Sequence, residues 1–403
     1  MKKLILLFFI ALSINATAQW VQQTSGTANT FYSIYFSNAN NGYATGFDSV
    51  MGNVMVRTVN GGLNWTGVTI PTTEDMFGVT FPTVFTGYAA GGNGTILKTT
   101  NGGSTWAVQA NTNTTHTLHG VCFTDSMTVF STGSSGTIIR TVNGGTSWMA
   151  QNVTSNSMYG IHFPSAAVGY AVGDMGSIFK TVDGGNSWMG QTSGTTLKLK
   201  SVHFVSIDTG YVVGYTGTIL KTTNGGTTWT TLNSGINNML FSVQFTSSST
   251  GYAVGTDQTI LKTINGGTSW TIQSPGNSNV STLRSVFFLN ANEGYVAGRD
   301  GTILKTFNAG GTLSVGATDN ESAGMITVYP NPASNVLNIV SNLNKVKNIR
   351  VTDVLGNEVK RFDTGTGSME AVMNISELAT GMYMVQISTE GNTQVIRKKV
   401  LVE

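Results

Sequence analysis

One short pattern recurs seven times along the first three quarters of this chain, and its spacing limits the fold more than any other feature. The copies start at residues 53, 94, 136, 176, 217, 258 and 301, so successive starts lie 40 to 43 residues apart. A typical copy is GTILKTTNGGTTW at 217–229. A fixed period of this length is typical of repeat architectures, in which each repeat is one supersecondary unit.

Each copy reads as a β-hairpin. A β-branched, alternating run such as TILKT meets Asn-Gly or Asp-Gly, which accept the positive φ angles of a tight turn, and the chain returns through Ser/Thr-Trp. A second strand lies upstream, usually GYAVG, and before it a third of the pattern LFSVQF (240–245). Four short strands per repeat predict a propeller blade, so the sequence predicts an all-β, seven-bladed β-propeller.

The two ends of the repeat region predict how the ring closes. The seventh hairpin ends in Leu313, where the other six carry Trp, and the seventh tryptophan of the chain is Trp20. We therefore expect the segment that begins at Trp20 to supply the outer strand of the last blade, which removes exposed sheet edges. A rival interpretation makes residues 312–316 that strand, with Trp20 only covering it.

The innermost strands align without gaps, and one of their positions predicts a binding site. The third residue is always Gly or Ser, the fourth Val or Ile and the sixth Phe, as packing near an axis demands. The second residue varies among large side chains: Tyr32, Phe77, His119, Tyr159, Lys200, Phe241 and Arg284. We expect these seven to ring the mouth of the central channel and to be ligand-binding candidates. The alternative is that they only plug the channel end.

The surroundings of this mouth favour recognition of a ligand. The connections before the inner strands are long and rich in Thr, Asn and Ser, and loops on a rigid scaffold often carry function. Hairpin tips on the same face carry Phe47, Asp48, Asn93, Asp174, Met175, Tyr215, Asp257, Arg299 and Asp300. Aromatic rings mixed with Lys and Arg suit a glycan, a peptide or another surface protein.

The repeat also carries a family resemblance. In the form TVDGGNSW (181–188) it resembles the Asp-box, or bacterial neuraminidase (BNR), repeat, a structural hairpin at the blade periphery, so Asp183 is not expected to be catalytic. Five other copies have Asn in its place. Over 20–313, GYAVG followed by ILKT-x-NGG-x-x-W resembles the photosystem II assembly factor type of propeller, which implies a seven-bladed binding scaffold.

The region after the propeller resembles the type A C-terminal sorting domain of the type IX secretion system. The matching marks are YPNP at 329–332, Asp353-x-x-Gly356, Leu378-x-x-Gly381-x-Tyr383 and a basic end before Val400. The resemblance implies a small Ig-like β-sandwich that an outer-membrane translocon reads. It also implies a protein secreted or held at the outer surface of a Gram-negative bacterium.

The N-terminus and composition complete the domain plan. Residues 1–18 have two lysines, an apolar core and a small-x-small end, as in a signal peptide. We predict a propeller over 19–317, a linker over 318–325 and the sorting domain over 326–403. No further stretch is apolar enough for a membrane-spanning helix. A net charge of +2 gives no reason to expect nucleic acid as a partner, and one cysteine excludes an intramolecular disulfide framework.

Two kinds of hydrolase share such repeats. A sialidase needs an arginine triad, but Arg57 and Arg140 occupy a hairpin position that is Lys in the other copies, which we interpret as a ring of solvated cations. A xyloglucanase needs a carboxylate pair. The open face offers Glu74, Asp75 and the hairpin-tip aspartates, and no pair is marked out by spacing. We expect a binding module without catalysis, and a glycoside hydrolase acting on extracellular polysaccharide is the alternative.

One cluster could hold a metal ion. Cys122, His162 and His203 occupy the fifth inner-strand position of three consecutive blades, and these residue types bind zinc or copper. The same position holds Tyr, Thr, Gln and Phe in the other blades, which is typical of packing between blades. We therefore predict no metal and no cofactor, and keep these three residues as a weak metal candidate.

Overall fold

The structure is a computed structural model that describes residues 20–48, 53–276, 282–307, 309, 326–329, 333–341, 345–353, 357–390 and 396–402. The chain divides into two compact units, Met1–Leu313 and Ser314–Glu403. The predicted signal peptide and linker lie outside the described residues. Among the residues described, no helix is long and apolar enough to span a membrane.

The first unit consists of four-stranded antiparallel sheets, the predicted blades. Blade 1 has strands β2 (Thr30–Phe36), β3 (Gly42–Phe47), β4 (Val54–Thr58) and β5 (Thr66–Gly67). Blade 2 has β6 (Met76–Thr80), β7 (Gly87–Gly91), β8 (Ile96–Thr99) and β9 (Ala107–Val108). Blade 3 has β10 (Leu118–Phe123), β11 (Val129–Gly133), β12 (Thr137–Thr141) and β13 (Met149–Asn152). Blade 4 has β14 (Met158–His162), β15 (Gly169–Gly173), β16 (Ile178–Thr181) and β17 (Met189–Gln191).

The remaining blades follow the same order. Blade 5 has β18 (Leu199–Phe204), β19 (Gly210–Gly214), β20 (Ile219–Thr222) and β21 (Thr230–Leu232). Blade 6 has β22 (Leu240–Phe245), β23 (Gly251–Gly255), β24 (Ile260–Thr263) and β25 (Thr271–Ile272). Blade 7 has β26 (Leu283–Phe288), β27 (Gly294–Gly298), β28 (Ile303–Thr306) and, as its outer strand, β1 (Val21–Gln23). Short 3-10 turns form three hairpin tips: η1 (Gly92–Gly94), η2 (Ser134–Gly136) and η3 (Asp174–Gly176).

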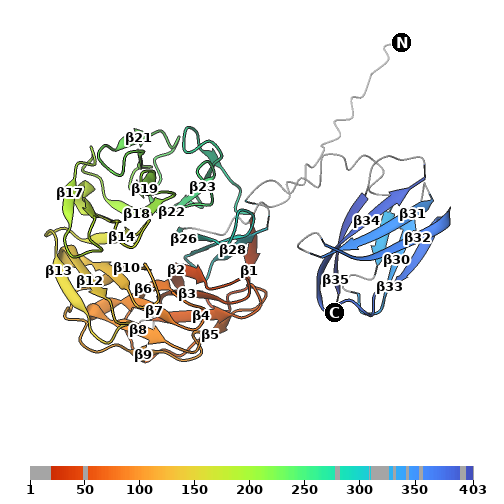
Figure 1. The fold of residues 1–403 in the computed structure, drawn as a ribbon, viewed down its shortest axis with the longest axis horizontal. Coiled ribbons are helices and arrows are strands. Elements are labelled where there is room, and N and C mark those ends of the chain that lie inside the picture. The colour runs from red at the N-terminus through yellow and green to blue at the C-terminus, as the bar shows by residue number, and fades with distance from the viewer. Residues whose placement is uncertain are drawn as a thin grey trace, which may run out of the picture. The chain divides into compact units, whose positions relative to one another are not determined.

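The blades form a closed ring, as Figure 1 shows. Each inner strand contacts the inner strands of both neighbouring blades, and β2 of blade 1 contacts β26 of blade 7. Strand β1 pairs with β28, Val21 opposite Lys305, and Trp20 beside it is fully buried. This confirms that the N-terminal segment completes the last blade. The rival strand, residues 312–316, lies outside the described residues.

A layer of aromatic residues packs between adjacent blades. In five blades the phenylalanine at the end of the inner strand stacks on the tyrosine of the preceding blade. For example, Phe204 lies 3.8 Å from Tyr170, measured between ring centroids. The hairpin tryptophan of its own blade, Trp229, meets Phe204 edge to face. Gly210 must be glycine because a Cβ there would lie 2.5 Å from the Phe204 ring. The Phe, Gly-Tyr and Trp residues of the repeat therefore pack together in the same way at the interface between neighbouring blades.

Side chains within each hairpin turn hold its shape. In blade 5 the Thr222 hydroxyl donates to the Asn224 side chain and accepts from the Gly226 amide. In blade 4, where the Asp-box aspartate is present, Asp183 accepts from Thr181 and from both the amide and the hydroxyl of Ser187. The Ser187 hydrogen bonds lower the pKa of Asp183 to about 2. These contacts account for the form of the turn that recurs in the repeats, and they are structural.

Five of the seven repeated cations donate to a carbonyl of the next blade, so their heads are not simply solvated, which corrects the interpretation made from the sequence. Lys221 Nζ donates to the Gly266 carbonyl, in the hairpin of the next blade, at 2.7 Å, and the Tyr211 hydroxyl donates to the same oxygen at 2.9 Å. Lysine or arginine makes the same inter-blade bond at four other seams: Lys98–Gly144, Arg140–Gly184, Lys180–Gly225 and Lys305–Gly61. Sequence spacing did not reveal the bond because its acceptor belongs to the next repeat.

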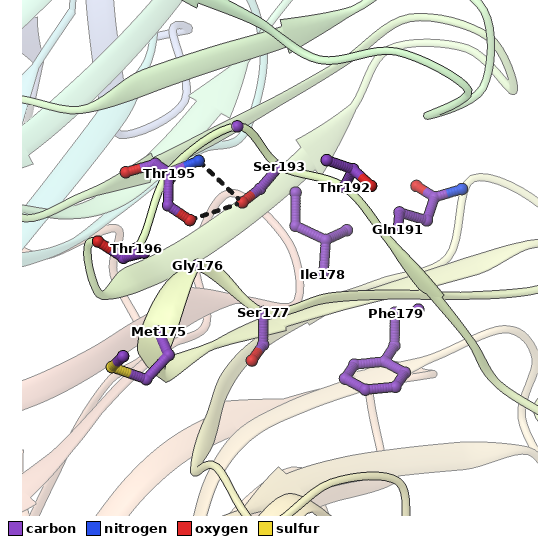
Figure 2. A pocket seen from close by; sticks show the side chains of 12 residues that line it. Met175, Gly176, Ser177, Ile178, Phe179, Gln191, Thr192, Ser193, Thr195 and Thr196 are labelled. Atoms are coloured by element: carbon purple, nitrogen blue, oxygen red, sulfur yellow. Dashed lines mark hydrogen bonds between the residues drawn. The ribbon is translucent and has the colours of Figure 1, made fainter.

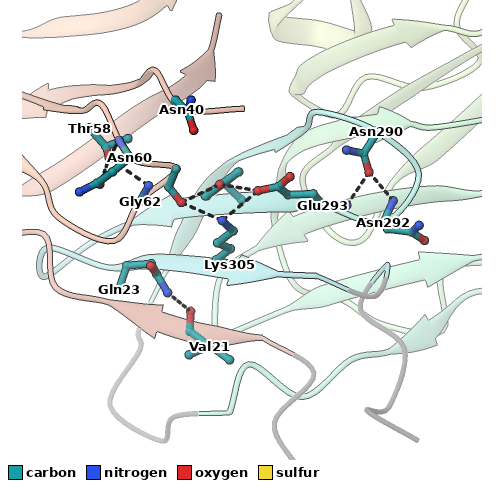
Figure 3. Close-up of polar contacts among 12 residues, drawn as sticks. Val21, Gln23, Asn40, Thr58, Asn60, Gly62, Asn290, Asn292, Glu293 and Lys305 are labelled. Atoms are coloured by element: carbon teal, nitrogen blue, oxygen red, sulfur yellow. Dashed lines mark hydrogen bonds and ion pairs between the residues drawn. The ribbon is translucent and has the colours of Figure 1, made fainter. Parts of the chain in front are cut away.

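The seam between blades 7 and 1 carries an additional charge (Figure 3). Lys305 and Tyr295 both donate to the Gly61 carbonyl, as at other seams. Here Glu293 adds an ion pair to Lys305 at 2.8 Å and lies 2.9 Å from the Tyr295 hydroxyl, whose one proton is within reach of both Glu293 and Gly61. Lys305 is only 6% exposed, so this ion pair neutralises a buried charge.

The second unit is a small β-sandwich, as predicted for the sorting domain. One sheet has the order β29 (Ile326–Tyr329), β30 (Val336–Ser341) and β33 (Glu370–Asn374). The other has the order β32 (Glu358–Ser368), β31 (Val346–Thr352), β34 (Gly381–Thr389) and β35 (Ile396–Val402). Its core includes Leu337, Ile349 and Ile387, with Leu378 and Tyr383 of the sorting-domain motif packed against it.

A candidate binding site at the axial mouth of the propeller

A β-bulge in every inner strand positions the candidate residues. In blade 5, Leu199 pairs with Gly214 and Ser201 pairs with Val213, so Lys200 has no partner in the register. The same shift surrounds the second residue of each inner strand. A bulge changes the direction in which the side chain of the extra residue points, compared with a regular strand. The sequence alignment located these positions but did not reveal the bulge.

The seven bulge residues meet at one place. They line a single cavity of about 250 Å³ on the propeller axis: Tyr32, Phe77, His119, Tyr159, Lys200, Phe241 and Arg284. All are half-buried. His119 approaches Ser134 of η2, and Tyr159 contacts Asp174 of η3, so the cavity opens on the face that carries these hairpin tips.

Neighbouring rings and cations contact one another around this cavity. Ring centroids are 4.9 Å apart for Tyr32–Phe77, 5.3 Å for Phe77–His119 and 5.0 Å for His119–Tyr159. Lys200 Nζ lies 3.4 Å from the centroid of Tyr159. The Arg284 guanidinium lies 4.9 Å from both Tyr32 and Phe241. The wall is therefore a chain of stacking and cation–π contacts.

The two cations in the wall have no acidic partner. Among the residues that the structure describes, neither Lys200 nor Arg284 forms an ion pair or a hydrogen bond, and Arg284 Nε is buried without an acceptor. Burial, followed by the charges of Lys198 and Arg284, lowers the pKa of Lys200 to about 7. Burial also lowers the pKa of Arg284 and that of His119, the latter to about 4. The cavity thus presents positive charge that a bound anion would stabilise.

A polar cluster at the edge of the cavity was not predicted as a site. Lys198 pairs with Asp174 at 3.0 Å and donates to the Tyr159 hydroxyl, which in turn donates to Asp174. Lys198 also lies 5.5 Å from the ring centroid of Tyr215. The sequence does contain a pattern that could have indicated this cluster. Lys198 occupies a position that is Thr117 in blade 3, and lysines stand on both sides of Leu199.

The acidic residues proposed for a hydrolase lie at the rim, where amides hold several of them. Asp48 accepts from Asn29, Glu74 from Asn93, and Asp257 from Asn238. Burial, followed by the charge of neighbouring Glu74, raises the pKa of Asp75. In these three blades the hydrogen bond links the hairpin tip to the loop that precedes the inner strand of the same blade, which is a structural role.

Cys122, His162 and His203, the weak metal candidate, do not come together as a set of metal ligands in the described structure. No group of three or more His, Cys, Asp or Glu side chains suited to a metal ion occurs in the described part of the chain. His162 and His203 lie 4.8 Å apart by ring centroids, and His162 accepts from the Phe204 amide of the next blade. Cys122 packs in the core between blades 3 and 4, and burial raises the pKa of its thiol. Gln244 makes the equivalent inter-blade bond to Phe288, so this position serves packing.

Two family models match the chain. The model described as photosynthesis system II assembly factor YCF48 matches residues 12–151 and 143–237. The model described as secretion system C-terminal sorting domain matches residues 327–403. No curated protein matches the chain.

Solved propellers are similar in fold. The structure of YCF48 bound to D1 peptide has a TM-score of 0.61 at 17% identity, covering 74% of this chain and 99% of that one. YCF48 from Cyanidioschyzon merolae has a TM-score of 0.60 at 19% identity, covering 71% and 98%. The WD40 β-propeller domain of Doa1 has a TM-score of 0.57 at 12% identity, covering 70% and 96%. At these identities the similarity shows the fold alone.

Proposed function

Because the chain belongs to the family described as photosynthesis system II assembly factor YCF48 and carries a secretion system sorting domain, we propose that it is an exported, non-catalytic binding propeller. Its ligand is a peptide segment of another surface protein, held at the axial mouth through an acidic group. One of the solved structures with a similar fold is a complex of YCF48 with a peptide, which supports a peptide rather than a glycan as the ligand proposed here.

The observation that carries this proposal is the pair of unpaired cations in the axial cavity. Lys200 and Arg284 face the same space of about 250 Å³, and aromatic rings form most of the remaining wall. A carboxylate entering this cavity gains charge-assisted hydrogen bonds. The rings add apolar contact area with little loss of side-chain entropy. Seven blades each contribute one residue, so the site is distributed over the whole ring.

Export supports the same function. The sorting domain indicates secretion or display at the cell surface. In our proposal residues 1–18 are a signal peptide, residues 326–403 are read by the type IX outer-membrane translocon, and residues 318–325 link them to the propeller over 19–317. A module placed outside the cell in this way meets surface proteins as partners.

The test is selection of phage-displayed random peptides on the immobilised full-length chain, followed by fluorescence anisotropy of labelled peptides. We expect enrichment of peptides with an acidic residue. The variants Lys200→Met and Arg284→Met should each weaken binding by about tenfold or more, since each removes a charge-assisted contact. Lys98→Met is the matched control, because its ammonium donates to Gly144 at the periphery.

Three other results would overturn the proposal. Enrichment that is insensitive to both cation variants would place binding elsewhere. Retention of a polysaccharide, with no peptide enriched, would make the ligand a glycan. New oligosaccharides in the soluble fraction would indicate the glycoside hydrolase that the sequence left as an alternative.

A further inference from the structure

Two hollows continue outward from the axial cavity over the junction of blades 4 and 5. The first, of about 460 Å³, is lined by residues that include Asp174, Met175, Thr196, Lys198 and Tyr215. It adjoins the axial cavity because Asp174 and Lys198 both bond the Tyr159 hydroxyl. The second, of about 730 Å³, shares Met175 and Thr196 with the first. The three spaces therefore follow one another from the axis to the outer strands of blade 4.

The residue at the junction of the two outer hollows is an unfavourable choice for its position. Met175, in η3, has a φ of 54° and is 63% exposed. The equivalent tip residues in other described blades also have positive φ and are polar: Asn93, Ser135, Thr216, Asp257 and Asp300. The left-handed region costs a non-glycine residue about 1–2 kcal/mol, and Asn or Asp tolerates it best. An exposed methionine there therefore indicates a role other than folding.

The chemistry of the outermost hollow suits the main chain of a peptide. Its lining is uncharged and rich in hydroxyl and amide groups, such as Ser177, Gln191 and Thr192 (Figure 2). Ser193 accepts from the Thr195 amide and donates to the Thr195 carbonyl, so the loop that forms one wall is already ordered. Hydroxyls and amides can both donate to and accept from peptide groups. The flexible thioether of Met175 packs against varied apolar side chains.

We propose that these two hollows form an extended groove, which we call the blade-4 groove, for the uncharged continuation of the same peptide. This inference rests on the proposed function and deepens it. The acidic residue of the ligand occupies the axial cavity, the chain passes over Met175, and the uncharged residues next to it in the peptide lie along Ser177 and the loop at 192–196. Continuity with the axial cavity, and the change from a cationic lining at the axis to an uncharged lining in the outermost hollow, place the acidic residue at the axial end.

The experiment uses the full-length chain and two labelled probes from the peptide selection: a long peptide, and its short fragment that keeps only the acidic residue and its immediate neighbours. The substitution is Met175→Asn. We expect it to weaken binding of the long peptide by about tenfold while the short fragment binds unchanged. We also expect an unchanged or higher Tm, since asparagine suits the positive φ. Ser135→Asn, at the same tip position of blade 3, is the matched control and should change neither affinity.

A second readout locates the peptide. With ¹³C-methyl-labelled methionine, the Met175 methyl signal, assigned by its loss in Met175→Asn, should shift when the long peptide is added and stay in place with the short fragment. The signal of Met149, which is exposed on blade 3, should not move. If long and short probes bind equally well and Met175→Asn affects neither, the groove is refuted while the axial site stands. If the short fragment fails to bind wild type, the proposed function itself is refuted.

Discussion

At the scale of single residues, the mouth of this propeller depends on one bulge position repeated in seven strands. Because the bulge takes the residue out of the pairing register, its side chain is free of the constraints that keep Gly or Ser, Val or Ile, and Phe at the neighbouring positions. Variation at this position therefore costs the fold little. The large side chains that vary at this position along the aligned repeats are the ones that meet in the cavity.

Lys200 should make ligand binding depend on pH near neutrality. Its pKa is lowered to about 7, mainly by burial, and the charged groups that act on it are Lys198, Arg284 and Asp174. An acidic peptide binds the protonated amine, so affinity should be highest below about pH 7 and fall as the pH rises above it, by at most about one log unit per pH unit. Anisotropy titrations at several pH values measure this fall.

The controls for that titration follow from the same charges. His119, with a pKa of about 4, stays neutral throughout the range and should contribute no transition. Lys200→Met should remove the pH dependence and bring the affinity at low pH close to the wild-type value at high pH. An affinity that rises with pH, or a fall that persists in Lys200→Met, would contradict the assignment.

Sequence could predict the residues of the mouth but not their chemistry. Alignment of the repeats located all seven, because periodicity places equivalent residues around one axis. It could not predict that Lys200 lacks an acidic partner or that Lys198 has one in Asp174, since those contacts depend on which neighbouring blade each side chain reaches. Met175 was noted only as a tip residue, and its φ is visible only in the structure.

At the scale of the strand and hairpin, three seams between blades (4–5, 5–6 and 7–1) are each fastened by a tyrosine and a lysine that donate to one shared carbonyl. In blade 5 these donors are Tyr211 and Lys221, and the acceptor is the buried carbonyl of Gly266. The lysines that the sequence predicted to be solvated therefore take part in the contact between blades at these seams. The physical reason is that the hairpin of one repeat lies against the strands of the previous one.

Removal of both donors should cost more than the sum of the two single losses. Tyr211→Phe and Lys221→Met should each lower the free energy of unfolding by about 1 kcal/mol, because the other donor still satisfies the carbonyl. The double variant leaves a buried carbonyl unpaired, which adds a penalty of about 1–3 kcal/mol. Urea unfolding followed by circular dichroism measures this coupling.

Substitution of an exposed residue in the hairpin that contains the acceptor provides the control for this cycle. Ile264→Thr changes a side chain that is 71% exposed and should leave the free energy of unfolding nearly unchanged. Strict additivity of Tyr211→Phe and Lys221→Met would mean that the two donors do not compete for one acceptor.

At the scale of the whole molecule, the ring is closed by the chain's own N-terminal strand. Trp20 packs edge to face on Phe288 at 5.9 Å, the geometry that Trp65 adopts on Phe36 within blade 1. Strand β1 then pairs with β28, and the ion pair of Glu293 with Lys305 reinforces the adjoining seam. The tryptophan count predicted this closure, because six hairpins carry a tryptophan and Trp20 is the remaining one. The ion pair of Glu293 with Lys305 could not be predicted, because it depends on the geometry of the seam.

Closure predicts that two equivalent tryptophans differ in importance. Trp20→Ala and Trp148→Ala each remove a buried indole in the same repeat position, and large-to-small changes of this kind cost about 3–5 kcal/mol. Trp148 lies within a blade that is covalently continuous on both sides, so its loss should stay local. Trp20 holds a strand close to the chain terminus, so its loss should also release β1, expose the edge of β28 and open the ring between blades 7 and 1. Hydrogen exchange should therefore rise in β26–β28 and in β2 for Trp20→Ala, and only around β10–β13 and the adjoining β7 and β8 for Trp148→Ala. Equal and equally local effects of the two substitutions would show that the other contacts of the seam, Glu293 with Lys305 and Tyr295 with Gly61, suffice to keep the ring closed.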